Sequence, residues 1–423
     1  MGLKMTKNLP LIVILGSTGT GKTKLSLELA KKFGGEIIGA DSMQIYRQLD
    51  IASAKATKEE QLIAPHHMID ILEPHEKFTV LEYRNKAIPI IENLLTNNKL
   101  PIIVGGTNYY IESLLWKILV HDINEKVEKN VLLLPLNYYE LSSEELHQKL
   151  ATVDTTMARR LHPSNKRKII RSLEVYYSKG RRHSDIIDEQ QSTKGGSKSG
   201  GGLRYNNACI LWMRCDQDIL NKRLNDRVDN MISQGLLDEL SYFHKLYNEQ
   251  RIKQNRTADY TKGIFQSIGF KEFHDYLILT EDEKASETGQ KILRESVDRL
   301  KLVTRRYARK QIKWTVNRFL GRTDREVPPI FGLDTSDVSN WNSDVSEPAV
   351  KIVNSFITGD PCDIQPLPKG DVISVSNATD DTFTCEVCNR VFVGDKQWQV
   401  HLNSNKHKKI KNKKSMLKEQ SVS

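Results

Sequence analysis

The stretch Leu11-Ile-Val-Ile-Leu-Gly-Ser-Thr-Gly-Thr-Gly-Lys-Thr23 decides the fold of this chain. Its first five residues are apolar, as in a strand that is buried on both faces of a parallel sheet. The next eight, Gly16–Thr23, match the pattern G-x-x-x-x-G-K-[ST], and a helical pattern with Leu25, Leu29 and Phe33 follows. This order predicts a P-loop, in which backbone N–H groups hold a phosphate.

The residue types in this loop suit a ligand with two or three phosphate groups. Its glycines let backbone N–H groups converge on the anion, and the start of the following helix adds positive potential. Lys22 supplies a cation, and the Thr23 hydroxyl is placed to bind Mg²⁺. The alternative is a glycine-rich turn that arose by chance. The predicted phosphate-binding residues are Gly16, Ser17, Thr18, Gly19, Thr20, Gly21, Lys22 and Thr23.

Three further strand-like runs continue the pattern along the chain: Glu36–Ala40, Leu100–Val104 and Ala208–Met213. Strands that alternate with helices indicate an α/β fold with a parallel sheet. We therefore predict a P-loop-type α/β core formed by residues 8–120 and 203–320.

The segments outside this core differ from it in composition. Residues 121–190 read as a helical, basic insertion domain, and residues 190–202 (QQSTKGGSKSGGG) as a flexible loop. Residues 285–320 have a long helical pattern with one basic face. Residues 321–381 are rich in Pro, Ser and Asp, and we predict a linker there with one short helix.

The composition narrows the class of protein. The chain has 423 residues, and 63 Lys and Arg against 53 Asp and Glu give a net charge of +10. Such an excess is compatible with a nucleic-acid partner. Five cysteines do not suit a secreted disulfide framework, and no apolar run approaches the roughly 20 residues that span a bilayer. We expect a cytoplasmic monomer that binds no membrane, with the nucleus and mitochondria open as further locations.

Asp41 is the acidic residue that the strand pattern places beside the P-loop. The run Pro101–Val104 ends in Gly-Gly-Thr107 with no acid, whereas Asp41 directly follows the strand-like run Glu36–Ala40. Carboxyl ends of strands and amino ends of helices share one crevice in doubly wound sheets. Asp41 could therefore lie beside the phosphate. A helix cap for Asp41 and a simple surface role for Gln44 are the alternatives.

Several motifs occur in one order along the chain and together resemble those of the tRNA dimethylallyltransferases. They are the P-loop unit, Asp41-Ser-Met-Gln-Ile-Tyr46, Gly105-Gly-Thr-Asn-Tyr-Tyr110, Asn165-Lys-Arg-Lys-Ile-Ile-Arg171, Gln266-Ser-Ile-Gly-Phe-Lys-Glu272 and Thr304-Arg-Arg-Tyr-Ala-Arg-Lys-Gln-Ile-Lys-Trp314. The resemblance covers residues 10 to about 320, and a C-terminal finger resembles the eukaryotic branch, notably the fungal enzyme.

The resemblance implies a specific reaction. It is the transfer of the dimethylallyl group of dimethylallyl diphosphate to N6 of adenosine-37, just 3′ of the tRNA anticodon, with release of diphosphate. It also implies that Asp41 is the general base and that Thr107 lies near the acceptor adenine. Lys22, Thr23 and Mg²⁺ would hold the diphosphate. Arg223 and Arg227 would complete this clamp, because i,i+4 spacing puts them on one helix face; the alternative is a solvated face.

The same resemblance, with the basic charge pattern, implies contacts to the anticodon stem-loop. Gln44 has a donor and an acceptor for an adenine edge, and Met43 and Tyr46 could pack on the base or the prenyl tail. Lys166 and Arg167 depart from the family's usual residue types. The predicted tRNA-binding residues are Asp41, Ser42, Met43, Gln44, Tyr46, Lys166, Arg167, Lys168, Arg171, Arg305, Arg309 and Lys313.

The module over residues 382–410 has the spacing of a C2H2 zinc finger. Its predicted ligands are Cys385, Cys388, His401 and His407. About 30 residues bury too little core alone, so the Zn²⁺ would supply folding free energy. With the basic tail over residues 411–423, the finger is expected to touch tRNA phosphates; the alternative is a finger that only caps or recruits.

Two other functions remain compatible with the P-loop. An ATP-dependent nucleic-acid kinase or NTPase would turn over ATP. A non-catalytic RNA-binding protein would keep its RNA affinity in an Asp41→Asn variant and have no activity to lose. The dimethylallyltransferase hypothesis instead predicts transfer to RNA without ATP.

Overall fold

The structure is a computed structural model that describes residues 9–117, 134–192, 196–197, 200–248, 252, 258–322, 325–369, 382–388 and 390–420. It contains two compact units. The first combines Met1–Ile118 with Leu203–Asp371, and the second combines Leu119–Gly202 with Val372–Ser423.

The first unit is built around a six-stranded sheet whose order is β3-β2-β4-β1-β5-β6. All neighbouring strands pair in parallel. The strands are β1 (Leu11–Gly16), β2 (Glu36–Gly39), β3 (His66–His67), β4 (Pro101–Gly105), β5 (Ala208–Arg214) and β6 (Ile330–Asp334). The predicted strands are therefore present, and the predicted α/β class with a parallel core is confirmed.

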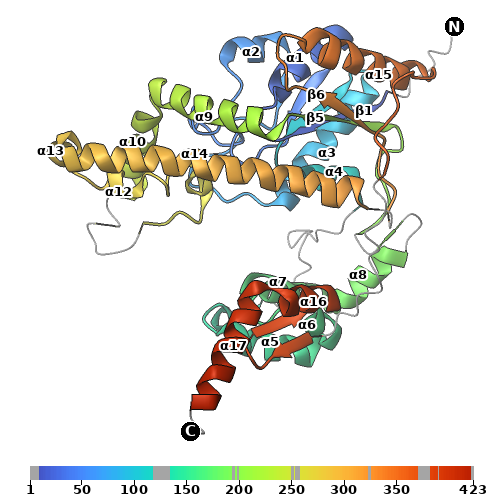
Figure 1. Ribbon diagram of the computed structural model, residues 1–423. Coiled ribbons are helices and arrows are strands. Elements are labelled where there is room, and N and C mark those ends of the chain that lie inside the picture. The colour runs from blue at the N-terminus through green and yellow to red at the C-terminus, as the bar shows by residue number, and fades with distance from the viewer. Residues whose placement is uncertain are drawn as a thin grey trace. The chain divides into compact units, whose positions relative to one another are not determined.

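Side chains of β1 alternate between the two faces of the sheet, as a strand requires. Leu11, Val13 and Leu15 pack in one cluster with α3 (Val80–Thr96) and α4 (Asn108–Leu115). Ile12 and Ile14 pack in the opposite cluster with α1 (Lys22–Phe33) and α15 (Glu347–Thr358). Helices thus cover both faces of the sheet (Figure 1), which explains why β1 is apolar throughout.

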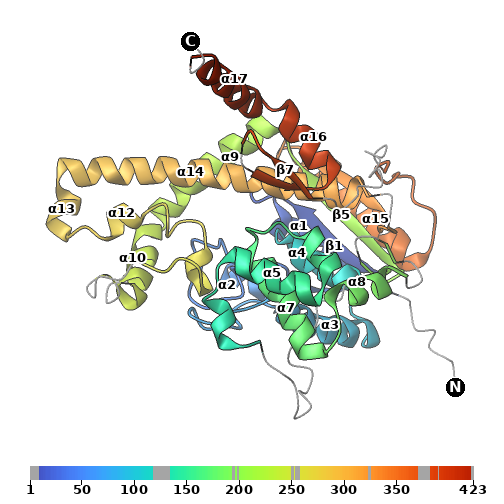
Figure 2. The same ribbon diagram turned by 90° about the horizontal axis from the view of Figure 1, so that it is seen from below.

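Among the described residues of the first unit, further helices are α2 (Lys58–Ile63), α9 (Gln217–Ser233), α10 (Leu236–Tyr247), α12 (His274–Leu277), α13 (Glu281–Ala285) and α14 (Glu287–Thr315), with a π-helical turn over Val316–Leu320. The predicted long helix over residues 285–320 is confirmed by α14, which runs alongside α9 in both views (Figures 1 and 2). No helix of the described residues is long and apolar enough to cross a bilayer.

The prediction of a linker with one short helix over residues 321–381 is right about the helix, which is α15, but wrong about the rest, because the segment also contains a strand of the sheet. Strand β6 pairs with β5 at the sheet edge, with Ile330 opposite Ile210. The buried side chains of α15 join the core beneath β1. The apolar residues of β6 follow two prolines and are interrupted by Gly332, so the sequence pattern concealed this strand. Residues 370–381 lie outside the described part.

The second unit contains a helical cluster and the finger. The helices are α5 (Ser143–Val153), α6 (Thr155–Arg160), α7 (Lys166–Lys179) and α8 (His183–Ser192), with a core that includes Leu146, Leu150 and Leu173. The buried Asp154 carboxylate joins two helix starts, because it accepts hydrogen bonds from the N–H groups of Met157 (2.9 Å) and Ser184 (2.8 Å). Residues 121–133 of the predicted insertion lie outside the described part.

The finger pairs β7 (Thr382–Cys385) with β8 (Arg390–Val393) in antiparallel fashion, followed by α16 (Asp395–Asn403) and α17 (Asn405–Gln420). The predicted tail from residue 411 is thus helical as far as residue 420. The predicted loop over residues 190–202 begins inside α8, which ends at Ser192. Part of that loop, 193–195 and 198–199, is not described.

Candidate active site

A cavity of about 830 Å³ opens at the carboxyl ends of β1, β2 and β4. The P-loop contributes Thr18, Gly19 and residues 21–24 to its wall, and the segment after β2 contributes Asp41. Gly105 and Gly106 line it at the end of β4. The structure therefore brings Asp41 into the same cavity as the P-loop, because parallel strands end at one edge of the sheet.

The P-loop has the backbone of an anion-binding turn. Gly19 (φ +83°) and Gly21 (φ +84°) adopt the left-handed conformation that glycine allows. The ammonium group of Lys22 donates a hydrogen bond to the Ser17 carbonyl at 2.8 Å, and the Thr20 hydroxyl donates to the same carbonyl at 2.9 Å. These bonds fold the loop over the start of α1.

Burial lowers the pKa of Lys22 from its usual value to about 8. The Asp41 carboxylate opposes this change, and the guanidinium of Arg227 adds to it. Burial also lowers the pKa of Arg227, again opposed by Asp41. Two cations and one carboxylate therefore interact inside the cavity, and an anionic ligand would favour the charged form of both cations.

Asp41 and Thr107 are held together by the backbone. One Asp41 oxygen, Oδ1, accepts the Met43 N–H at 2.9 Å, so Asp41 fixes a turn rather than capping a helix. The Thr107 hydroxyl oxygen accepts the Ser42 N–H at 3.0 Å, and the Thr107 N–H donates to the Ala40 carbonyl at 3.0 Å. The loops after β2 and β4 thus form one wall.

Gln311 of α14 joins the P-loop to the loop after β4, a role that sequence reasoning missed. Its Oε1 accepts the Thr18 N–H at 2.9 Å, and its Nε2 donates to the Gly106 carbonyl at 3.0 Å. Tyr307, one turn earlier, also lines the cavity. Burial and the nearby Asp41 charge raise the Tyr307 pKa, whereas hydrogen bonds with Thr107 and Gln311 oppose that rise. The sequence did contain a signal for these two residues. Tyr307 and Gln311 are spaced i,i+4, so they share one face of an otherwise basic helix.

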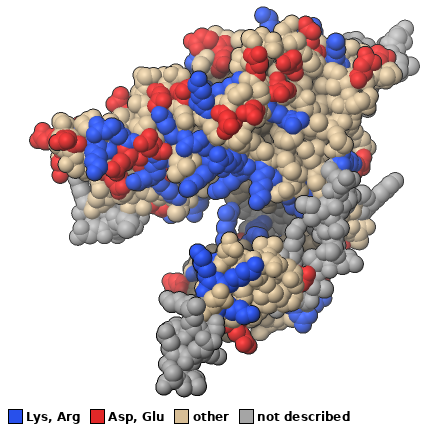
Figure 3. All heavy atoms as spheres, in the orientation of Figure 1, with Lys and Arg blue, Asp and Glu red and all other residues tan. Residues whose placement is uncertain are grey.

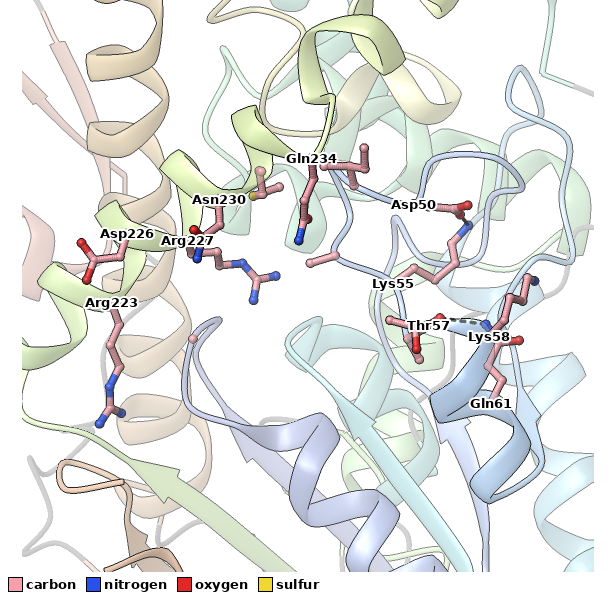
Figure 4. A pocket seen from close by; sticks show the side chains of 15 residues that line it. Asp50, Lys55, Thr57, Lys58, Gln61, Arg223, Asp226, Arg227, Asn230 and Gln234 are labelled. Carbon is pink, nitrogen blue, oxygen red and sulfur yellow. Dashed lines mark hydrogen bonds and ion pairs between the residues drawn. The ribbon is translucent and has the colours of Figure 1, made fainter. Parts of the chain in front are cut away.

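The two predicted clamp arginines take different directions. Arg227 lines the cavity and reaches toward the P-loop, whereas Arg223 donates to the carbonyls of Thr335 (2.6 Å) and Ser336 (2.7 Å). Figure 4 shows the two side chains pointing apart. Arg223 nevertheless lines the cavity that adjoins the first, together with Gly19 and Arg227, so its place in the clamp stays a prediction.

A second cavity, of about 780 Å³, adjoins the first and is drawn in Figure 4. The two share the lining residues Gly19, Ala54, Lys55, Arg227 and Met231. Its outer wall includes Thr57 and Lys58 on one side and Asn230 on the other. The two cavities therefore meet beside the P-loop.

The loop after Asp41 uses several predicted base-binding groups for its own structure. Gln44 lines the cavity, but its Nε2 donates to the carbonyls of Ser53 (3.2 Å) and Ala54 (3.1 Å). Tyr46 is buried, and its hydroxyl donates to the Glu76 carbonyl at 3.0 Å. Met43 also lines the cavity. The Gln44 amino group is thus engaged within the protein, and the expectation that Gln44 reads an adenine edge stays a prediction.

Two charged side chains, buried Lys55 and half-buried Glu239, fasten this loop. The Lys55 ammonium donates to Asp50 and Asp70, each at 2.6 Å, and to the Tyr46 carbonyl at 2.8 Å. The Glu239 carboxylate accepts three successive backbone N–H groups, from residues 50 to 52. Such charge-assisted bonds give the loop a fixed path.

Trp341 supports the P-loop from the segment that the sequence predicted as a linker. A Cβ atom at Gly21 would lie 2.9 Å from the Trp341 ring, so only glycine fits there. The indole N–H donates to the Glu28 carboxylate at 2.9 Å, and the Lys24 ammonium lies 4.3 Å from the ring centroid. This segment is therefore part of the site's framework.

The predicted RNA-binding cations fall into exposed and engaged groups. Arg309 and Lys313 are exposed on α14, where Figure 3 shows Lys and Arg gathered along the helix. Arg305 instead donates to the Asn225 side chain of α9. Helix α14 therefore has an exposed basic face, and the Arg305 contact ties the helix to α9.

In the second unit, Lys166 is structural, because its ammonium donates to the carbonyls of Tyr139 (3.0 Å) and Leu141 (2.6 Å). Its assignment as a tRNA contact stays a prediction. Arg171 lies 3.4 Å from the Glu174 carboxylate. The neighbouring Arg167 and Lys168 are exposed.

The four predicted zinc ligands form one cluster, with donor atoms that all lie within 4.8 Å of one another. His407 Nδ1 is 3.6 Å from the Cys385 sulfur, 3.4 Å from the Cys388 sulfur and 3.1 Å from His401 Nε2. Zinc bonds of about 2.0–2.3 Å in tetrahedral geometry suit such separations. The donor set and its geometry fit a structural zinc ion.

Comparisons with known proteins agree with this arrangement. The family profile "IPP transferase" matches residues 44–318, "Isopentenyl transferase" matches 9–65, and "Zinc-finger double-stranded RNA-binding" matches 382–408. The chain is 46% identical to the mouse tRNA dimethylallyltransferase over 96% of this chain and 86% of that protein. It is 32% identical to the Saccharomyces cerevisiae enzyme of the same name over 96% and 92%.

A solved structure of a eukaryotic dimethylallyltransferase acting on tRNA superposes with a TM-score of 0.79 at 29% identity. The match covers 98% of this chain and 99% of that one. The predicted family is therefore confirmed: the chain belongs to the IPP transferases, as an enzyme of the tRNA dimethylallyltransferase group with a C-terminal zinc finger.

Proposed function

We propose that this prenyltransferase joins the dimethylallyl group of dimethylallyl diphosphate to N6 of adenosine-37 in tRNA, with Asp41 as the general base. The observation that carries this proposal is the shared cavity of Asp41 and the P-loop. A carboxylate and an anion-binding turn in one cavity can serve a reaction in which an amine loses a proton and a diphosphate leaves.

The transfer needs a base because an adenine amino group is a poor nucleophile. Its lone pair is delocalised into the ring, so loss of the N6 proton must accompany bond formation. The N6 nitrogen forms a bond to C1 of the prenyl group, the C1–O bond breaks, and diphosphate leaves with that electron pair. Asp41 takes the N6 proton. The Thr107 hydroxyl, fixed beside Ser42, lies on the same wall to orient the acceptor base.

The leaving diphosphate needs positive charge that acts most strongly as the C–O bond breaks. Lys22 and Arg227 supply it, because both line the cavity, both are half-buried and both interact with Asp41. The P-loop N–H groups over residues 19–21 add hydrogen bonds. The Thr23 hydroxyl also lines the cavity and suits Mg²⁺, which would neutralise part of the diphosphate charge when bound.

The two adjoining cavities give the substrates separate approaches. A diphosphate that enters through the second cavity would meet Arg227 and Gly19, which line both cavities. The acceptor base would then enter from the side lined by Asp41 and Tyr307. Such a base must leave the anticodon-loop stack, which costs less in a loop than in a duplex.

The exposed cations Arg309 and Lys313, with Arg167 and Lys168 of the second unit, are the proposed contacts to tRNA phosphates. The finger, whose profile match is to double-stranded RNA binders, would hold the anticodon stem. Exposed cations suit this role because phosphate contacts need charge rather than deep burial.

The test is transfer of a labelled dimethylallyl group to an anticodon stem-loop RNA with Mg²⁺ and no nucleotide. We expect label on the wild-type RNA and none on an RNA whose adenosine-37 is replaced by inosine, which lacks the amino group. ATP hydrolysis without any labelled RNA would contradict the proposal.

A further inference from the structure

Two large aromatic side chains are exposed at the edge of the site, although no step described so far uses them. Tyr109, in the first turn of α4, is 47% exposed, and Trp314, in the last turn of α14, is 37% exposed. Their ring centroids are 6.2 Å apart with an interplanar angle of 71°. Contiguous exposed apolar surface marks interaction sites more often than single exposed residues do.

The pair continues the wall of the cavity. Tyr307, Gln311 and Trp314 follow i, i+4, i+7 spacing, so they share one face of α14. The first two line the cavity, and Trp314 extends the row beyond its edge. In the same way, Tyr110 lines the cavity and Tyr109 is its neighbour in α4.

The Trp314 ring and the helix that carries Tyr109 are both held in place. The Trp314 indole N–H donates to the buried Glu112 carboxylate at 2.6 Å, and the same carboxylate accepts a bond from Arg318 at 2.8 Å. The Asn108 amide donates to the Gln311 carbonyl at 3.2 Å, which fixes α4 against α14. A rigid ring loses little conformational freedom when it binds a ligand.

The charge around the pair is positive. Arg309, Lys310 and Lys313 are exposed on the adjoining turns of α14, and Figure 3 shows the basic side chains gathered there. Residues 304–318 contain no acidic residue, and Glu112 of α4 is buried. Aromatic rings among cations match the two features of single-stranded RNA, flat bases and phosphates.

We propose that Tyr109 and Trp314 form a stacking surface for an unpaired anticodon-loop base next to the acceptor adenosine. When the acceptor enters the cavity, its neighbour in the RNA loses a stacking partner. The Tyr109–Trp314 surface lies beside the cavity and replaces that partner. This inference rests on the proposed function, because it takes the anticodon loop as the occupant.

The experiment measures binding of anticodon stem-loops that carry 2-aminopurine at the position 5′ or 3′ of the acceptor. Stacking quenches this fluorophore. We expect Tyr109→Ala to weaken binding roughly tenfold, in line with the loss of one base–aromatic stack. The bound probe should also become brighter at one of the two positions. Tyr109→Phe, which keeps the ring, should behave as wild type.

Two matched controls separate stacking from other effects. Tyr242→Ala removes a tyrosine of similar exposure, 55%, on α10, and should change neither affinity nor fluorescence. Lys310→Ala should lower the slope of log affinity against log salt by about one phosphate contact, whereas Tyr109→Ala should leave that slope unchanged.

Wild-type affinity and fluorescence in both Tyr109→Ala and Trp314→Phe/Tyr109→Ala would overturn the inference. If the wild-type enzyme still transfers the prenyl group to these RNAs, that result leaves the proposed function intact. If wild-type enzyme neither binds nor modifies the RNAs, both the inference and the proposed function fail.

Discussion

The cavity and the zinc finger are built in opposite ways. The cavity takes its side chains from separate segments, among them the P-loop, the turn at Asp41 and the face of α14 that carries Tyr307 and Gln311. The finger takes all four metal ligands from residues 385–407. The cavity therefore exists only when the whole sheet and α14 are assembled, whereas the finger needs one short segment and a metal.

This difference indicates that the two regions serve different parts of the function. In the cavity, the same groups that would act on substrates, such as Lys22 and Asp41, already interact with one another. In the finger, the ligand cluster holds the fold, and RNA contacts would come from other residues. We therefore expect changes in the cavity to affect the chemical step and changes in the finger to affect RNA affinity.

The largest expected effect is that of Asp41→Asn. Loss of a general base should slow transfer by roughly 10²–10⁴-fold, measured by single-turnover transfer of a labelled prenyl group. RNA affinity should stay within about twofold, because an Asn oxygen can still accept the Met43 N–H. A rate equal to that of wild type would remove Asp41 from its proposed role.

Trp341→Ala tests whether the segment after residue 321 stabilises the part of the protein that forms the cavity. Loss of a buried tryptophan against Gly21 should cost about 3 kcal/mol of the unfolding free energy, measured by urea denaturation followed by circular dichroism. The exposed Val338, in the same segment, is the matched control, and Val338→Ala should cost under about 0.5 kcal/mol. Equal stability of the two variants would show that Trp341 supports nothing.

Cys385→Ser tests whether the zinc finger contributes to RNA binding and not to the chemical step. Losing one of four zinc ligands should unfold the finger and weaken stem-loop binding roughly tenfold, a loss of the size expected when a few phosphate contacts disappear. The rate at saturating RNA should stay within about twofold, and the zinc content should fall. A large loss of rate at saturating RNA would break the separation between cavity and finger.

The smallest expected effect is a pH shift inside the cavity. Lys22 has a pKa of about 8, so binding of dimethylallyl diphosphate should weaken as the pH rises through that value and Lys22 loses its proton. Asp41 raises the Lys22 pKa, so in Asp41→Asn the loss should begin at a lower pH. Calorimetric titrations of both proteins across this range give the two midpoints, and an unshifted midpoint would contradict the assigned interaction.

Much of the fold could be predicted because its signals are local. The apolar run before Gly16 and the glycines after it specify a strand and a phosphate-binding turn in any context. Strand β6 escaped prediction because its short apolar run becomes a strand only when β5 is there to pair with it. Composition reflects the preferences of an isolated segment, whereas an edge strand forms only when a neighbouring strand supplies its hydrogen bonds.

The sequence by itself determined the P-loop, four of the six strands of the sheet and the spacing of the zinc ligands, because each depends on near neighbours in the chain. Only the tertiary structure decided which polar groups face the cavity. Arg223 and Arg227 share a helix and a charge, yet the turn after β6 engages the first, and the second reaches the P-loop. Side-chain direction follows from packing against distant segments, and that packing is not written in local spacing.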